Sequence, residues 1–190
     1  NTGYLRLTNF TPDAGKEVRH AVVALKESGA KSVILDLREN PGGLLNEAVN
    51  ICNIFLPKGQ LVVTMKGKIP EFNSTYQTES APTDLEMPVA VVVNRNSASA
   101  SEIVAGTLQD YDRGIVVGEK SYGKGLVQLT RQVGYNSQVR ITTAKYYTPT
   151  GRCIQVLDYS HRRQDGSVGS VPDSLKKPFK TTNGRTVYDG

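Results

Sequence analysis

The chain of 190 residues is long enough for one domain with a sizeable buried core. Its formal net charge of +5 comes from scattered lysines and arginines, without a basic stripe interleaved with aromatic residues, so no nucleic-acid partner is expected. No apolar run approaches the about 18 to 20 residues of a membrane-spanning helix. The two histidines and two isolated cysteines form no ligand cluster, so no metal site is expected either.

The apolar pattern predicts alternating strands and helices. Strands are expected at residues 4–7, 33–37, 61–66, 89–93, 114–117, 126–133 and 138–147. One helix is expected to start at 11–13 and to stop at Gly29, and two more are expected to cover 44–55 and 99–109. Residues 67–87 are expected to form a long excursion or an exposed hairpin. This order predicts an α/β fold in which βαβ units build a mixed sheet with helices packed on it.

Ser99 lies in the segment Asn96-Ser97-Ala98-Ser99-Ala100-Ser101-Glu102, between the strand 89–93 and a helix. A serine at such a turn can present its hydroxyl as a nucleophile. The N–H of Ala100 would then point toward a developing oxyanion at the helix N-terminus. A structural alternative is a capping box, in which Ser99 caps the helix and Glu102 bonds back to it.

Lys124 is the candidate base, because a lysine can take the proton of a serine once its amine is neutral. The pKa of the amine must therefore fall toward about 7 or 8, which burial in apolar surroundings can achieve. Gly123 and Gly125 flank the lysine and allow close approach of another element, and the apolar pair Leu126-Val127 is expected to desolvate its tip. The same stretch nearly matches a phosphate-binding P-loop, but Gly125 replaces the required hydroxyl, so no nucleotide is expected.

A second oxyanion donor is expected from the turn Asp36-Leu37-Arg38-Glu39-Asn40-Pro41-Gly42-Gly43. A strand leads into this turn and a helix follows it. Glycines allow positive φ values and close approach, so Gly42 or Gly43 can aim an N–H at a substrate carbonyl. The alternative is a plain tight turn that feeds the helix.

These three blocks together resemble the carboxyl-terminal processing proteases, also called tail-specific proteases, which are serine–lysine endopeptidases. The resemblance covers most of positions 3–155 and keeps the order of the family motifs. Lys124 follows Ser99 by 25 positions and Gln128 follows Lys124 by four, as in the family. The resemblance implies that Ser99 is the nucleophile, Lys124 the general base and Gln128 the residue that orients the lysine amine.

The resemblance also implies a ClpP-like or crotonase-like spiral of ββα units. No cofactor is needed, and the expected substrates are proteins or peptides with apolar carboxyl termini, in a bacterial periplasm or cell envelope. Homo-oligomerisation stays open. Residues 1–157 are expected to form the catalytic core and 158–190 a polar extension of the same domain, with the family's PDZ domain outside this chain.

Two other functions stay open. One is a catalytically silent, peptide-binding scaffold on the same fold. The other is an acyl-CoA enzyme of the crotonase type, in which Ser99 would be unreactive.

Overall fold

The computed structural model describes residues 1–189, except the side chain of Ser160. It confirms the α/β class, with the strands divided between two four-stranded sheets and two small hairpins. The helices are α1 (Ala14–Glu27), α2 (Leu45–Phe55) and α3 (Ala100–Asp110). The strands are β1 (Thr2–Arg6), β2 (Ser32–Asp36), β3 (Leu61–Gly67), β4 (Ser74–Gln77), β5 (Val89–Val93), β6 (Gly114–Gly118), β7 (Leu126–Gly134), β8 (Ser137–Tyr147), β9 (Leu157–Arg162), β10 (Val168–Ser170), β11 (Pro178–Lys180) and β12 (Thr186–Tyr188).

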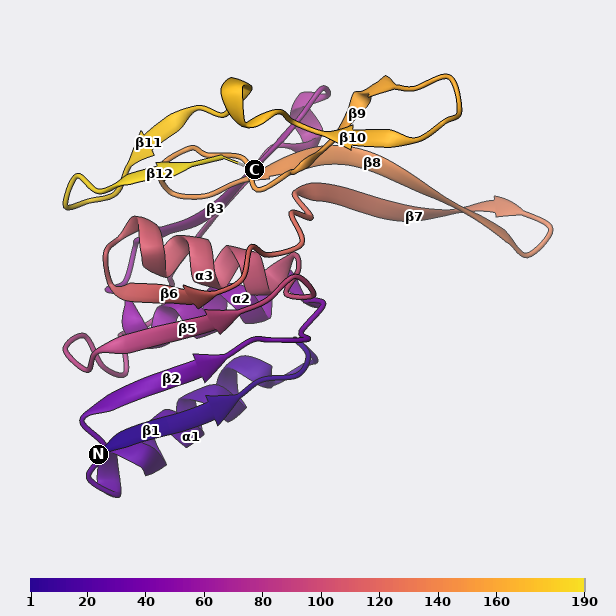
Figure 1. Cartoon of the computed structure of the whole chain (residues 1–190). Coiled ribbons are helices and arrows are strands. Elements are labelled where there is room, and N and C mark those ends of the chain that lie inside the picture. The colour runs from indigo at the N-terminus through magenta and orange to yellow at the C-terminus, as the bar shows by residue number, and fades with distance from the viewer. Residues whose placement is uncertain (190) are drawn as a thin grey trace.

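The first sheet is parallel throughout and has the order β1-β2-β5-β6. Its strands are short and rich in valine, isoleucine and leucine, which suits a sheet that is largely buried. The second sheet is antiparallel, with the order β4-β3-β8-β7. Helix α3 packs on both β6 and β3, so it lies between the two sheets (Figure 1).

One continuous core joins the parallel sheet to all three helices. Cys52, predicted to be a small buried hydrophobe, has no solvent exposure in α2, and both cysteines are free thiols. The largest fully buried side chains of this core are Phe10, Phe55, Leu35, Leu37, Ile51, Ile54, Ile103 and Leu108.

One boundary differs from the prediction, and the hairpin expected within residues 67–87 is present. Helix α1 begins only at Ala14, because Asp13 has a left-handed backbone with φ of 69° and Pro12 lies in the preceding turn. The excursion at 67–87 contains a short 3-10 turn at Pro70–Phe72 and the strand β4, which pairs with β3 as a hairpin.

The carboxyl-terminal residues fold back on the rest of the chain as two hairpins, β9–β10 and β11–β12. Thr182 donates both its N–H and its hydroxyl to the carbonyl of Asp110 at the end of α3. Arg185 forms an ion pair with Asp112 just beyond that helix. These contacts attach the extension to α3. That the extension belongs to the same domain as residues 1–157 stays a prediction.

Candidate active site

Parallel pairing brings the predicted site residues to one edge of the first sheet. The loops at 37–44, 94–99 and 119–125 follow β2, β5 and β6, three strands that run in the same direction side by side. The carboxyl ends of neighbouring parallel strands meet at one edge, where open α/β sheets usually bind their ligands. The candidate nucleophile, base and oxyanion donors all lie in or next to these loops.

Ser99 is the accessible member of three closely spaced serines. The Ser97 hydroxyl is buried and donates to the carbonyl of Leu37 at 2.8 Å. The Ser101 hydroxyl is also buried and donates to the carbonyl of Asn40 at 3.0 Å. Ser99 is only half-buried. The two neighbouring hydroxyls therefore hold the loops together, and Ser99 is the serine of the three that stays accessible.

The backbone of Ser99 has an unusual conformation. Its φ of 56° and ψ of −112° lie in a region that non-glycine residues rarely adopt and that is often found at active sites. Ser99 stands at the N-cap of α3, and Ala100 is the first helical residue. Among residues 1–189 the Ala100 N–H has no hydrogen-bond acceptor, as expected for an N–H at a helix N-terminus.

The two candidate oxyanion glycines differ in what their N–H groups do. The Gly42 N–H donates to Oδ1 of Asn40 at 2.9 Å. Gly43 is exposed, and no acceptor for its N–H is found in the described chain. The hydrogen bonds of this bridge are formed by the neighbouring residues, because the Phe10 N–H donates to the Gly42 carbonyl and the Leu44 N–H donates to the Phe10 carbonyl. Of the two glycines, Gly43 has the free N–H.

Gly42 instead provides close approach to the serine turn. A Cβ at this position would lie 2.7 Å from the Ala98 carbonyl oxygen, 2.9 Å from the Ala100 nitrogen and 2.9 Å from Ser99 Cβ. Its φ of 98° also favours glycine. The Pro-Gly-Gly turn is therefore packed directly on the turn that carries Ser99, which a simple connection to α2 would not require.

Asn40 joins the two turns and was not predicted as a site residue. It is fully buried, its side-chain amide donates to the Leu7 carbonyl at 2.8 Å, and its own carbonyl accepts from the Ala98 N–H at 3.0 Å. An asparagine beside a Pro-Gly pair is a common turn residue, so the sequence alone gave little indication of this role.

Asp36 anchors the start of the same loop. Its carboxylate accepts from the Arg38 guanidinium at 2.7 Å and from the Tyr4 hydroxyl at 2.6 Å. The hydrogen bonds from Arg38 hold the pKa of Asp36 well below its usual range, although burial opposes the shift. The carboxylate therefore stays ionised beside the glycine turn.

The side chain of Lys124 is exposed, which contradicts the expectation of a desolvated amine. Leu126, expected to cover the lysine, pairs with Lys145 on β8 and lines a groove on the outer face of the second sheet. The apolar residue after the lysine therefore faces another part of the molecule. Lys124 itself lies in the loop between β6 and β7, at the edge that carries Ser99.

Glu102 connects the lysine loop to the serine turn. Its Oε2 accepts the N–H of Ser99 at 2.8 Å and the N–H of Lys124 at 2.9 Å. Its Oε1 accepts the Gly123 N–H at 2.6 Å and the Ser121 hydroxyl at 2.8 Å. The predicted capping box between Ser99 and Glu102 is thus present, and the carboxylate of Glu102 also binds a loop that lies about twenty residues away in sequence.

The pKa of Glu102 is raised because the carboxyl group is buried, and the four donors only partly offset this effect. Only 3% of the residue is exposed. A buried carboxylate shared by two loops is costly unless all its acceptor sites are used, as they are here.

The opposite side of the lysine loop packs on residues 155 and 156. The Gly125 N–H donates to Oε1 of Gln155 at 2.8 Å, and the Val156 N–H donates to the Gly123 carbonyl at 3.1 Å. A Cβ on Gly125 would lie 2.4 Å from the Gln155 nitrogen. The flanking glycines thus permit a close approach, as predicted, and the backbone of the loop is held on both sides.

Gln128 lies on β7, opposite Thr142 of β8 and next to an irregularity in the strand pairing. It is exposed. It starts the free part of the β7–β8 hairpin, which projects from the body of the molecule (Figure 1).

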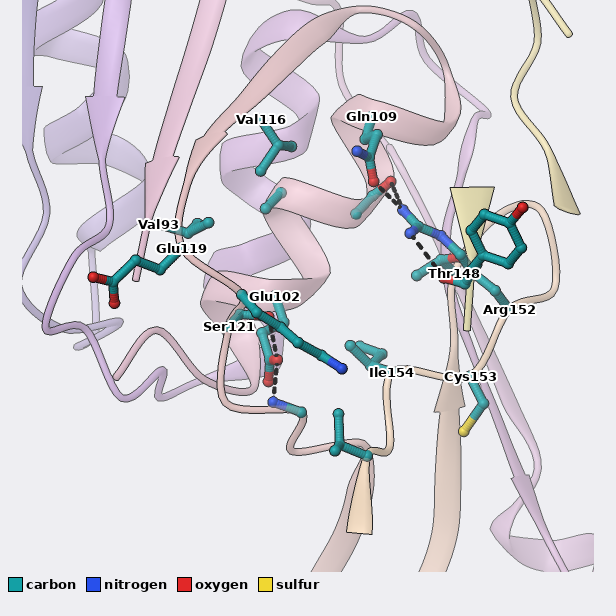
Figure 2. A pocket seen from close by; sticks show the side chains of 16 residues that line it. Val93, Glu102, Gln109, Val116, Glu119, Ser121, Thr148, Arg152, Cys153 and Ile154 are labelled. Atoms are coloured by element: carbon teal, nitrogen blue, oxygen red, sulfur yellow. Dashed lines mark hydrogen bonds between the residues drawn. The ribbon is translucent and has the colours of Figure 1, made fainter. Parts of the chain in front are cut away.

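A cavity of about 310 Å³ lies behind Glu102, between α3, β6 and the segment 148–156. Figure 2 shows the Glu102 and Ser121 pair on one side of it and Arg152, bonded to Gln109, on the other. Its apolar walls come from Val93, Ala105, Val116, Ile154 and Val156. Ser99 and Lys124 are not among its lining residues.

Residues 1–189 contain no group of three histidine, cysteine, aspartate or glutamate side chains placed to hold a metal ion. Within these residues no helix has the length and apolar character needed to cross a bilayer.

Comparisons with known proteins agree with the resemblance noted from the motifs. The model of peptidase family S41 matches residues 1–158. The chain is 44% identical over 157 residues to the carboxyl-terminal-processing protease of Synechocystis sp., and this match covers 83% of the chain and 36% of the relative. It is 43% identical over 159 residues to the carboxy-terminal-processing protease of Bartonella bacilliformis, covering 80% and 36%. The chain therefore spans about a third of the length of these relatives.

Solved structures show the same relationship. The photosystem II D1 C-terminal processing protease is 34% identical, with a TM-score of 0.74 over 81% of this chain and 39% of that chain. An S41 protease from Bacteroides fragilis shares the fold, with a TM-score of 0.68 at 21% identity. This chain belongs to peptidase family S41.

Proposed function

We propose that this chain is the catalytic core of a serine endopeptidase that processes proteins near their carboxyl termini through an acyl-enzyme. The observation that carries the proposal is the accessibility and backbone conformation of Ser99. It is the one serine of its motif that is accessible, and it stands in a strained turn at the start of α3. Membership of family S41 and the processing activity for which the Synechocystis and D1 relatives are named support the same assignment.

In the proposed reaction Ser99 Oγ attacks the scissile carbonyl while the neutral amine of Lys124 takes the hydroxyl proton. The N–H groups of Ala100 and Gly43 stabilise the tetrahedral oxyanion, and each such donor is typically worth about 3 to 4 kcal/mol of transition-state stabilisation. The lysine then gives its proton to the departing amine. Water repeats the same sequence to release the acyl group.

The exposure of Lys124 adds a requirement to this mechanism. A solvated ammonium is a poor base, so the amine must lose its water when the enzyme works. We assign this desolvation to the bound substrate, which would cover the edge where Ser99 and Lys124 lie. Gln128 then orients the amine from β7.

The proposed substrates are proteins with unstructured, apolar carboxyl termini, and the proposed location is a bacterial periplasm or cell envelope. The family resemblance supports both. The apolar walls of the cavity behind Glu102 also suit an enzyme that handles apolar side chains.

The exposed lysine favours a second candidate, a catalytically silent scaffold that binds peptides at the same edge. Labelling with a fluorophosphonate probe, followed by peptide mass spectrometry, separates the two. The protease predicts modification of Ser99, loss of labelling in Ser99→Ala, and cleavage of an unfolded protein with an apolar carboxyl terminus. A chain that binds such a protein but never labels or cleaves is the scaffold.

A further inference from the structure

The β7–β8 hairpin has two chemically different faces. In its free part the cross-strand pairs Leu129 with Ile141 and Arg131 with Val139 share one face. The opposite face carries only polar and charged side chains, namely Gln128, Thr130, Gln132, Gln138, Arg140 and Thr142. Leu129, Val139 and Ile141 are all exposed, so no other part of the described chain covers the apolar face.

This apolar face forms one wall of a groove of about 760 Å³. The other wall is the turn that follows β3, where Ile69 is 53% exposed and Phe72 is half-buried. Leu126, Leu129 and Ile141 face these residues across the groove. The volume and the apolar walls are in the range of known ligand sites.

The groove is strongly cationic. Lys66, Lys68, Arg131 and Lys145 line it, and no aspartate or glutamate does. Within the described residues none of these four side chains forms an ion pair. Lys66 packs over the ring of Tyr147, with 5.1 Å from its Nζ to the ring centre, and its charge stays uncompensated.

We propose that this groove binds an extended polypeptide segment in which apolar and acidic side chains alternate. An extended chain points successive side chains to opposite sides, so the apolar ones can contact Leu129 and Ile141 while the carboxylates reach the lysines and Arg131 at the rim. A second copy of this chain would bring the same four cations together, which disfavours it. A flat membrane surface would not enter the concave wall.

The groove is separate from the catalytic face. Gln128 pairs with Thr142 and points to the side of β7 opposite the face that carries Leu129. Leu126, which lines the groove, lies two residues after Lys124. A segment bound in the groove would therefore order the strand that carries Gln128 without blocking Ser99. The proposal does not depend on proteolysis.

Fluorescence anisotropy with the Ser99→Ala chain tests the binding, because this variant cannot cleave the probe. The probe is a fluorescein-labelled peptide of eight alternating leucine and glutamate residues, capped at its carboxyl terminus. We expect saturable binding that weakens at least about tenfold in Arg131→Glu, and likewise in Ile141→Asp. Arg140→Glu makes the same charge change on the opposite face of the hairpin and is expected to leave the affinity within about twofold.

Several results would overturn the proposal. One is the absence of saturable binding, and another is an equal loss of affinity in Arg140→Glu, which would mean attraction by net charge alone. Equally tight binding of a probe with lysine in place of glutamate would also contradict the proposal, because it would show that the carboxylates do not contribute. Dimerisation in sedimentation that Ile141→Asp abolishes would assign the groove to a second copy of the chain. Binding to phosphatidylglycerol vesicles without binding of the peptide would assign it to a membrane.

Discussion

The amide nitrogens of Ser99 and Lys124 donate to the same atom, Oε2 of Glu102, at 2.8 and 2.9 Å. The backbone that carries the proposed nucleophile and the backbone that carries the proposed base therefore lie side by side, although neither side chain takes part in the link. Glu102 holds the spacing of the two loops through their main chains.

Glu102→Gln is expected to lower activity and stability together. An amide keeps one acceptor oxygen but turns its NH₂ group toward two N–H or O–H donors, so two of the four hydrogen bonds are lost. We expect the free energy of unfolding to fall by about 2 to 3 kcal/mol and kcat/KM to fall about 100-fold. Denaturant unfolding and a peptide-cleavage assay measure the two effects. Glu27→Gln, on an exposed part of α1, should change neither, and full activity in Glu102→Gln would show that the shared carboxylate is dispensable.

Gly42→Ala is expected to close the oxyanion site. The added Cβ would lie 2.9 Å from the Ala100 nitrogen and would also force a residue with a side chain into a φ of 98°. Losing one oxyanion donor typically lowers kcat about 100-fold or more. The control is Gly59→Ala, where φ is 84° but no atom lies within 4 Å of the new Cβ.

Both glycine variants are expected to lose about 1 kcal/mol of stability from backbone strain. Only Gly42→Ala should lose activity. If Gly59→Ala lost as much activity, strain rather than the contact with the serine turn would be responsible.

Gln128→Ala is expected to reduce kcat with little change in KM or stability. Gln128 is exposed on β7, so its loss leaves no cavity, and its proposed role is to orient the lysine amine during the reaction. The expected loss is about tenfold to 100-fold. Gln132→Ala removes the same side chain further along the same face of the hairpin and should have no effect. Equal activity in the two variants would remove Gln128 from the mechanism.

Much of the site was predictable from the chain because each loop follows a short apolar strand. The valine run at 89–93 predicts β5 as observed, and the Ser/Ala-rich turn after it places Ser99 at the start of a helix. Parallel pairing of β2 with β5 then brings the Pro-Gly-Gly turn to the serine. These features depend on local sequence pattern and on topology, which a single sequence reveals.

The surroundings of Lys124 were predicted wrongly because they depend on tertiary contacts. A leucine two residues after a lysine can lie over it or turn away, and the pairing of Leu126 with Lys145 turns it toward the outer groove. Asn40 and Glu102 were overlooked as links between loops for a similar reason. Their partners lie in segments distant in sequence, and each residue also has an ordinary local role as a turn residue or helix cap.

Asp84 gives a prediction for the pH dependence of stability. Burial would raise the pKa of its carboxyl group, but hydrogen bonds from Lys26 and from the N–H groups of Met87 and Glu86 outweigh burial and lower the pKa from 3.8 to about 2. A lowered pKa means that the folded state favours the ionised form. The stabilisation is therefore present above about pH 4 and disappears as the pH falls toward 2.

Asp84→Asn should accordingly lower the free energy of unfolding by about 1 to 2 kcal/mol at pH 7. The difference from the unmodified chain should shrink as the pH falls through 2 and vanish well below it, where the carboxyl group of Asp84 is protonated. Urea titrations at several pH values measure it. If the difference in the free energy of unfolding were the same at pH 7 and at low pH, the charge of Asp84 would not contribute to stability.

Whether Lys124 is the base for Ser99 is tested by the kcat/KM of Lys124→Met beside Lys120→Met on an unfolded protein with an apolar carboxyl terminus. Both lysines are exposed in the same loop, so the two variants make the same chemical change four residues apart. We expect Lys124→Met to keep its fold but to lose at least about 100-fold in kcat/KM, while Lys120→Met stays within about twofold of the unmodified chain. A Lys124→Met chain as active as the unmodified one would contradict this role of Lys124.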